Sequence, residues 1–364
     1  MATFRCYFEG DHPGLVKRIE EHFRRMEAVW AEIAGKATGL ALGGGYGRGE
    51  GGVLETAGGG PGLFNDFDYF LFTDHPDDPA VIAWARARER EETAALGVDV
   101  EIKTLPPSDV ERGMDTMMFA DLVAGNVPVA GDCGFLSRLA AGVDFRRIGA
   151  DDAARLLWNR GSGLYFARGR MTTDPAFVIR NHAKLKLALG DALLCLDGAY
   201  VPWCRERGER VAAASQPVAV PELPAWHAEA VEFKFRPFTQ APDRAHLEAE
   251  SRRLATAWLE VFLTVEARRL GCAIPDLESY RALPVVVPAS PWWRNAALAA
   301  RDRLKRGAFL RPWRDYPRGA LMRALPCLLE LGGSSEMDAG SFLPVPAGGE
   351  GWQGAYARWW QYYS

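Results

Sequence analysis

The chain has 364 residues, enough for two ordinary domains, because single hydrophobic cores stop growing at about 250–300 residues. Its 48% hydrophobic and 25% charged residues are typical of a folded globular protein and exclude a disordered or fibrous one. The 43 basic and 47 acidic residues give a net charge of −4, so no overall positive field favours nucleic acid or an anionic membrane as a partner.

The cysteine pattern and the apolar runs bear on where the protein works. The six cysteines are scattered, without a C-x-x-C pair or a tight cluster with histidine, which predicts free thiols in a reducing compartment and no structural zinc. No apolar stretch approaches the roughly 20 residues that span a bilayer, and the first residues lack a basic region followed by an apolar run. We therefore expect a cytoplasmic protein without membrane contact.

The opening third of the chain alternates helix and strand signals. Apolar residues from Leu15 to Ile33 recur at spacings of three and four, which predicts an amphipathic helix. Residues 39–44 are short and apolar enough for a buried strand, and 11 of the 20 residues from Gly43 to Gly62 are glycine, which predicts a loop without helix. The rest of this third is predicted as strand, helix and strand, at residues 66–73, 79–97 and 98–105.

After about Asp151 the strand signals fade and helical periods take over, in three long segments at residues 153–170, 177–207 and 246–271. Proline-rich stretches interrupt this part and are predicted to divide it into smaller bundles. The sequence thus predicts an α/β (α+β) protein, with a small mixed-sheet domain at residues 1–150 followed by an all-helical domain at residues 151–364 that binds the substrate or acceptor.

Carboxylates gather on two of the predicted strands. Asp66 and Asp68 share one face of their strand because alternate side chains point the same way, and Asp99 and Glu101 do so on the later strand. Several carboxylates in one place disfavour one another's ionisation unless cations neutralise them. Hard oxygen ligands of this kind suit Mg²⁺ or Mn²⁺, and Mg²⁺ is usually completed by the phosphates of a substrate.

A glycine loop at Gly43–Gly52 precedes these carboxylates. Glycine allows positive φ and a close approach of the backbone to a ligand, so successive amides can form an anion-binding nest. The loop and the carboxylates together predict a phosphoryl-transfer site for a nucleoside triphosphate (NTP).

The combination of a glycine loop, a D-x-D strand and a later acidic strand resembles the DNA polymerase beta-like nucleotidyltransferase superfamily, over roughly residues 30 to 130. The loop sequence GGYGRGE at Gly44–Glu50 is similar to that of the bacterial uridylyltransferases that modify the PII protein. The resemblance implies that Gly44 and Gly45 grip the triphosphate and that Asp66 and Asp68 hold two metal ions. It further implies that Asp99 holds one metal and deprotonates the acceptor hydroxyl.

Two residue assignments stay open at this point. Glu101 lies on the same face as Asp99 and is either a partner of that residue or the true third ligand. Arg48 either contacts the triphosphate and neutralises the leaving pyrophosphate or pairs with Glu50 across the turn. A lone D-x-D is structural more often than catalytic, but the glycine loop before it and the acidic strand after it favour the metal site.

The chain also departs from the uridylyltransferase pattern. A glycine-rich insert at residues 52–64 separates the loop from the aspartates; it is either a flap or a sign that the resemblance holds only at superfamily level. The six histidines form no histidine-aspartate hydrolase motif, so de-uridylylation is not implied. The glycines also fit G-x-G-x-x-G by letters, but a dinucleotide site needs a helix directly after the loop, which this insert disfavours.

Two features of the later chain bear on the acceptor. Lys184 shares a helical face with Asn181 and Asp191, and either reaches a γ-phosphate or belongs to an ordinary solvated face. Eight basic residues lie between Arg301 and Arg323, and six tryptophans lie late in the chain. These residues are either a solvated basic face with core tryptophans or a surface for an acidic protein or a glycan phosphate.

The sequence therefore predicts a metal-dependent nucleotidyltransferase. It would move a nucleoside monophosphate from an NTP to a hydroxyl of a small molecule or a protein, and release pyrophosphate. The alternative is a catalytically inactive nucleotide-binding or partner-binding protein of the same fold.

Overall fold

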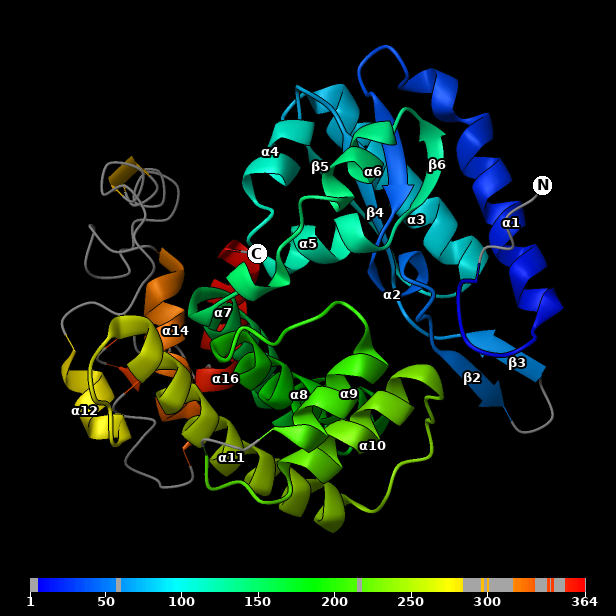
Figure 1. The fold of residues 1–364 in the computed structure, drawn as a ribbon. Helices are drawn as coiled ribbons and strands as arrows, with labels where there is room; N and C mark the ends of the chain where they lie inside the picture. Colours follow the sequence, from blue (N-terminus) through cyan, green and yellow to red (C-terminus); the bar gives the residue numbers. More distant parts are fainter. Residues whose placement is uncertain are drawn as a thin grey trace. The chain divides into compact units, whose positions relative to one another are not determined.

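A computed structural model describes residues 6–56, 60–214, 218–283, 296–297, 300, 317–330, 339–340, 342–343 and 351–363 (Figure 1). The chain forms two compact units. The first unit comprises Met1–Ile148, Asp197–Ala213 and Ala228–Phe238, and the second comprises Gly149–Leu196, Ala214–His227 and Thr239–Ser364. The first division lies near the predicted boundary at residue 150, but two later segments belong to the first unit rather than to the helical region.

The first unit is built on a four-stranded mixed sheet with the strand order β5-β4-β1-β6. The pair of β4 with the edge strand β5 is parallel, whereas β1 pairs antiparallel with both β4 and β6. This sheet confirms the predicted α/β class and the three predicted strands, and β6 was not predicted. The strands are β1 (Gly39–Leu42), β4 (Phe67–Phe72), β5 (Val100–Leu105) and β6 (Val127–Gly131).

Helices cover both faces of this sheet (Figure 1). One face packs on α1 and α3 around an apolar core that includes Ile19, Met26 and Tyr69. The other face packs on shorter helices around Phe70, Phe72 and other buried apolar side chains. The helices are α1 (Pro13–Ala28) and α3 (Pro79–Leu96) on the first face, and α4 (Pro107–Arg112), α5 (Met117–Ala124) and α6 (Gly134–Ala140) on the second. The predicted first helix ends earlier than expected, at Ala28, and a short 3₁₀ turn follows at Trp30–Glu32.

The glycine loop contains one turn of helix, α2 (Gly44–Gly47), so the prediction of a loop without helix was wrong there. Tertiary contacts of Tyr46 explain why the turn forms in spite of its glycines. The Tyr46 ring stacks on Phe67 with 4.4 Å between centroids, and its hydroxyl donates to Gly52 O and accepts from Phe64 N. The turn is therefore held by a buried side chain rather than by helix propensity.

The glycine-rich insert forms a separate two-stranded hairpin, which the sequence did not predict. Its strands are β2 (Val53–Thr56) and β3 (Gly60–Leu63), paired antiparallel. The Tyr46 hydroxyl lies at its base, because it bonds the backbone both before β2 and after β3. The hairpin is thus anchored to the glycine loop that precedes it.

In the second unit the described secondary structure is helical. The helices α7 (Ala150–Arg168), α8 (Pro175–Leu196) and α11 (Arg244–Leu270) pack against one another. They lie in the three predicted helical segments, but the second segment was predicted to continue to residue 207, whereas α8 ends at Leu196. Shorter helices α12 (Leu277–Ala282), α14 (Pro317–Leu329) and α16 (Trp352–Tyr363) complete the described part. Two further helices lie in the later segments that return to the first unit. Helix α9 (Cys204–Ala213) belongs wholly to the first unit, whereas α10 (Leu223–Phe235) begins in the second unit and ends in the first.

The late tryptophans and arginines are only partly described. Trp359 is buried on α16, as expected of a core residue, and the half-buried Trp360 contacts Trp158 with 4.6 Å between ring centroids and a tilt of 41°. The basic patch from Arg301 to Arg314, with Trp292, Trp293 and Trp313, lies outside the described residues.

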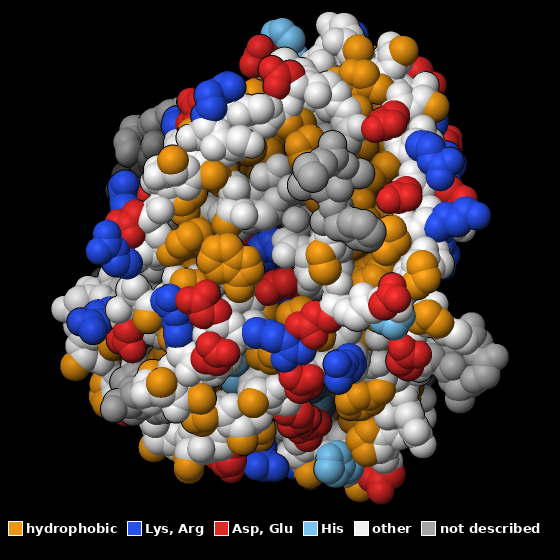
Figure 2. Space-filling view, turned by 45° about the vertical axis from the view of Figure 1, so that its right-hand side comes forward, with side chains coloured by type: hydrophobic (Ala, Val, Ile, Leu, Met, Phe, Trp, Pro, Cys, Tyr) orange, Lys and Arg blue, Asp and Glu red, His pale blue; other side chains and the backbone are white. Residues whose placement is uncertain are grey.

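No helix in the described ranges combines the length and hydrophobicity needed to cross a membrane. On the face drawn in Figure 2, acidic and basic side chains of the described residues are interspersed. The cysteines Cys6, Cys133, Cys195, Cys204, Cys272 and Cys327 are free thiols.

Candidate functional site

The register of the parallel strands decides which carboxylates are neighbours. Asp68 on β4 lies directly opposite Glu101 on β5. Asp66 and Asp99 each lie one residue before their strands, where Phe67 N donates a 2.8 Å hydrogen bond to Asp99 O. The two predicted acidic pairs therefore meet as two cross-strand rows, with Asp68 beside Glu101 and Asp66 beside Asp99.

Asp68 is in an unfavourable electrostatic environment for a carboxylate. Burial raises its pKa, and the like charges of Glu101 and Asp66 add to this effect. Lys103 opposes the rise: its Nζ lies 3.9 Å from Asp68 Oδ1 and 3.5 Å from Glu101 Oε2. We call Asp66, Asp68 and Glu101 the carboxylate cluster, because the charges of Asp66 and Glu101 act on Asp68.

The third carboxylate was left open between Asp99 and Glu101. In the structure Glu101 is the cross-strand neighbour of Asp68, and its charge acts on that residue. Asp99 is exposed and lies beside Asp66 at the edge of the strand pair. The geometry therefore favours Glu101 over Asp99 as the partner of Asp68, whereas the resemblance favoured Asp99.

The glycine loop packs directly on Asp68. Gly43 N donates to Asp68 O at 2.8 Å, and Gly44 follows with a φ of +61°. A Cβ at Gly44 would overlap the Asp68 carboxylate oxygen Oδ2, so this position requires glycine for both its backbone and its close approach. Gly45 has ordinary φ, and its Cβ would lie 3.2 Å from Glu50 O. The structure thus brings the predicted loop glycines and Asp68 together.

Arg48 and Glu50 of the loop motif point into the protein. The predicted pairing between them is confirmed, with Arg48 Nε 3.4 Å from Glu50 Oε2. Arg48 Nη1 also lies 3.2 Å from Asp121 Oδ2, and only 10% of its side chain is exposed. Its contact with a triphosphate stays a prediction, and the observed partners give it a role in holding the loop.

Glu50 joins the loop to two later helices of the same unit. Its carboxylate accepts a 2.7 Å hydrogen bond from Lys234 Nζ on α10 and a 2.6 Å bond from Cys204 N at the start of α9. Burial opposes its ionisation, but Lys234 and Arg48 hold the pKa of Glu50 below its ordinary value. A chain of buried ion pairs therefore fixes the rear of the glycine loop.

The carboxylate oxygens of this site suit a divalent cation whose coordination shell is completed by groups from outside the protein. No group of three or more acidic, histidine or cysteine side chains close enough to hold a metal occurs within the described residues. Asp68 and Glu101 are nonetheless adjacent oxygen donors, and Mg²⁺ commonly takes only one or two carboxylates from a protein while phosphates and water complete its shell. The residues fit a metal that arrives with a nucleotide, rather than a preformed three-carboxylate cage.

Lys184 lies on α8, in the second unit, and its side chain is half-buried. The solvated face expected for its helix neighbours was wrong at Asp191, which is buried and bonded to His227 Nε2 at 3.0 Å. Asn181 Nδ2 donates to Phe177 O at 2.8 Å. The predicted contact of Lys184 with a γ-phosphate stays a prediction.

The sequence interpretation missed Lys103, although a signal for it existed. In the alternating pattern of residues 98–105, Lys103 shares the face of Asp99 and Glu101. Asp121 gave no such signal, because only the tertiary fold brings it to Arg48.

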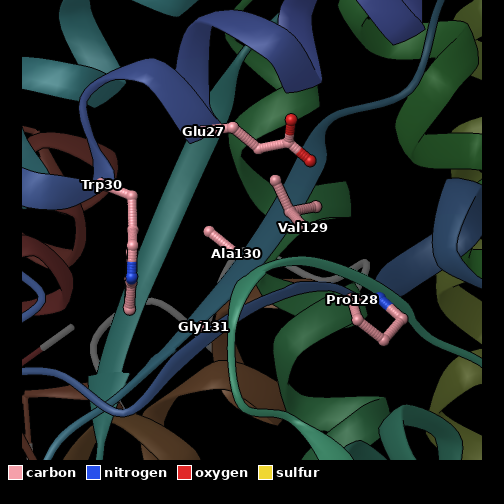
Figure 3. A pocket seen from close by; sticks show the side chains of 6 residues that line it. All are labelled: Glu27, Trp30, Pro128, Val129, Ala130 and Gly131. Carbon is pink, nitrogen blue, oxygen red and sulfur yellow. The ribbon is translucent and has the colours of Figure 1, made fainter.

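A surface hollow of about 430 Å³ lies elsewhere in the first unit, between the end of α1 and strand β6 (Figure 3). Glu27 and Trp30 line it on one side, and residues Pro128–Gly131 line it on the other. Strand β6 is at the opposite edge of the sheet from β5, so the hollow is separate from the carboxylate cluster.

Compared with protein-family models and with curated proteins, the sequence matches none. The resemblance to the nucleotidyltransferase superfamily therefore depends on the motif and on the geometry described above.

Proposed function

We propose that the protein is a metal-dependent nucleotidyltransferase. It transfers a nucleoside monophosphate from an NTP to a hydroxyl of a small molecule or a protein, with release of pyrophosphate. The observation that supports the proposal is the packing of Gly44 against the Asp68 carboxylate, which brings the glycine loop next to the acidic strand pair.

In this proposal each part has one task. The first-turn amides of α2, at Gly44 and Gly45, have no acceptor within the helix and would donate to phosphate oxygens. Asp68 and Glu101, with Asp66 and Asp99 beside them, would hold Mg²⁺ or Mn²⁺, which supplies charge neutralisation of the triphosphate when bound. One of these four carboxylates would accept the proton of the acceptor hydroxyl. Most of the catalysis is positioning and charge stabilisation.

Two further residues have proposed roles. Arg48 supports the loop through its ion pairs with Glu50 and Asp121, and Lys184, proposed from its helical face alone, remains a candidate for a contact with the γ-phosphate. A cytoplasmic location, where NTPs are present and thiols stay reduced, agrees with the six free cysteines.

A second candidate is a catalytically inactive nucleotide-binding or partner-binding protein. Lys103 favours it, because its ammonium group already supplies a positive charge beside Asp68 and Glu101. A lysine that permanently replaced the metal would leave a site able to bind nucleotide without transferring it.

A thermal-shift panel separates the two candidates. ATP, GTP, CTP and UTP are each added with and without Mg²⁺ to wild type, to Asp68→Asn and to the matched control Asp77→Asn, whose side chain is exposed. A ligand that binds only the native state raises its melting temperature by mass action.

The proposal expects a Mg²⁺-dependent shift with at least one NTP that Asp68→Asn loses and Asp77→Asn keeps. A shift of equal size without Mg²⁺, retained in Asp68→Asn, would favour the inactive binding protein. If none of the four NTPs shifts wild type with Mg²⁺ present, the nucleotidyltransferase proposal fails.

A further inference from the structure

Lys103 is the cation that the structure places within the carboxylate cluster. Its Nζ lies 3.5 Å from Glu101 Oε2 and 3.9 Å from Asp68 Oδ1, close enough for charge attraction to both. The distance to Asp68 exceeds that of a hydrogen bond, so the ammonium group neutralises this carboxylate without being tightly held by it.

The strand geometry explains how Lys103 reaches this position. In the β4–β5 register Lys103 lies opposite Phe70, one alternate position beyond the Asp68–Glu101 pair and on the same face. The Nζ atom lies 5.8 Å from the centroid of the Phe70 ring, and Phe70 belongs to the apolar core on that face. The aliphatic stem can therefore stay on apolar surface while the head group moves.

The head group of Lys103 is partly exposed to solvent. The Lys103 side chain is 39% exposed, compared with 31% for Asp68 and 59% for Glu101. By contrast, the buried Lys186 in the second unit lies only 2.5 Å from Glu250 and is 5% exposed. Lys103 has the loose, half-exposed geometry of a replaceable ion pair, whereas Lys186 has that of a fixed one.

We propose that Lys103 is an exchangeable counter-ion that a divalent cation displaces from Asp68 and Glu101, so that metal and triphosphate bind this site cooperatively. The inference rests on the proposed function and adds a regulatory property to its site. The ammonium and the divalent cation draw on the same two carboxylates and repel each other, which weakens metal binding in the absence of nucleotide. A bound triphosphate offers the displaced ammonium a new anionic partner and removes that penalty.

The coupling must be reciprocal, because each ligand changes the affinity of the other by the same factor. Titration calorimetry therefore measures Mn²⁺ alone, and then Mn²⁺ in the presence of inorganic tripolyphosphate, which carries the phosphate chain common to all NTPs. The proteins are wild type, Lys103→Met, Lys103→Arg and Asp68→Asn, with Lys36→Met as the matched control. Lys36 forms an exposed surface pair with Asp78 in the same unit.

Lys103→Met is expected to bind Mn²⁺ alone about tenfold more tightly than wild type at low salt, since one positive charge near the site is removed. The gain in Mn²⁺ affinity on adding tripolyphosphate is expected to shrink in this variant. Lys103→Arg keeps the charge and is expected to retain the wild-type coupling, and Lys36→Met is expected to behave as wild type. Lys103→Gln serves the same purpose as Lys103→Met should the latter fold poorly.

Two outcomes overturn the inference in different ways. Equal Mn²⁺ affinity in wild type, Lys103→Met and Lys103→Gln, with binding still lost in Asp68→Asn, removes the role of Lys103 and leaves the proposed function standing. Mn²⁺ binding that is the same in Asp68→Asn as in wild type, with and without tripolyphosphate, overturns both.

Discussion

Each face of the four-stranded sheet has a carboxylate among buried side chains, and the two carboxylates differ in how fully protein groups compensate their charge. On the face covered by α1 and α3, Glu92 accepts hydrogen bonds from Arg25 and bonds His22 Nδ1 at 2.7 Å. On the other face, Asp68 has a lysine at 3.9 Å and acidic neighbours. One carboxylate is saturated by the protein, and the other is not.

The pKa values express the same contrast. Burial opposes ionisation of Glu92, but hydrogen bonds from Arg25 and His22 hold its pKa below the ordinary value. Burial raises the pKa of Asp68, and Lys103 only partly compensates for it. The Glu92 carboxylate on α3 is thus compensated by protein groups, whereas that of Asp68 on β4 is compensated only in part, which agrees with the proposed metal site.

The largest effect expected from this contrast is on catalysis. Asp68→Asn should reduce pyrophosphate release by about three orders of magnitude, on the order of 4 kcal/mol of barrier, because it removes a metal ligand at constant size. Glu92→Gln should leave the turnover of folded protein nearly unchanged. Steady-state kinetics with the NTP found in the thermal-shift panel measure both turnover rates. Equal losses of turnover in the two variants would contradict a catalytic role specific to Asp68.

A smaller effect is expected where the loop meets Asp68. Gly44→Ala forces a side chain into positive φ and against the Asp68 carboxylate, so it should destabilise the protein by about 1–3 kcal/mol and weaken NTP binding. Gly62→Ala, in strand β3, has only a carbonyl oxygen at 3.8 Å from its Cβ and should be nearly neutral. Urea unfolding and NTP titration compare them; a neutral Gly44→Ala would contradict the described contact.

Glu92→Gln should lower the free energy of unfolding by about 1–2 kcal/mol, since it weakens hydrogen bonds to a charged acceptor. The loss stays moderate because Arg25 is already half-exposed and water can solvate its charge. Asp68→Asn should not destabilise the protein. Urea denaturation at pH 7 tests both. A loss in Asp68→Asn as large as that in Glu92→Gln would show that Asp68 is also a structural carboxylate.

The smallest expected effect is the pH dependence, with opposite signs for the two residues. The lowered pKa of Glu92 contributes stability that is present above its unfolded value and is lost as pH falls through the folded value. The raised pKa of Asp68 contributes stability that is present below the pKa of the unfolded state and is lost as pH rises through the pKa of the folded state.

Asp68→Asn should therefore be more stable than wild type at pH 7, by less than about 1 kcal/mol, and the difference should disappear toward pH 4. Glu92→Gln should be less stable at pH 7, and its deficit should also shrink as the pH falls into the acid range. Unfolding curves of the three proteins at several pH values measure these differences. The same sign of difference for both variants at pH 7 would refute the assignment.

Local patterns in the sequence were sufficient to predict much of the secondary structure of the first unit. The alternation in residues 66–73 and 98–105 placed the acidic side chains on one face of each strand, and the structure has both strands. The glycine content of the loop predicted a close approach of its backbone to a ligand, but it gave no sign of the packing of Gly44 on Asp68 or of the one-turn helix at Gly44–Gly47. That turn forms because Tyr46 is buried against Phe67, a contact that no helix propensity records.

The sequence did not predict how the later chain is divided between the two units. The sequence assigned everything after residue 151 to one helical domain, although its helical periods reached only the start of α9 and did not include α10. The C-terminal part of α10 and all of α9 nevertheless belong to the first unit, where Glu50 binds Cys204 N and Lys234 Nζ. Periodicity reports which face of a helix is apolar, and does not report which core that face joins.

The sequence by itself determined the elements of the site: a glycine loop, a D-x-D strand and a second acidic strand, each specified by residues that are near neighbours in the chain. Only the tertiary structure decided that Glu101 rather than Asp99 lies beside Asp68, that Lys103 stands next to this pair, and that Arg48 turns inward to Asp121. The reason is physical: alternation fixes the face of a side chain within one strand, whereas register between two parallel strands depends on the crossover helix and the core that packs them.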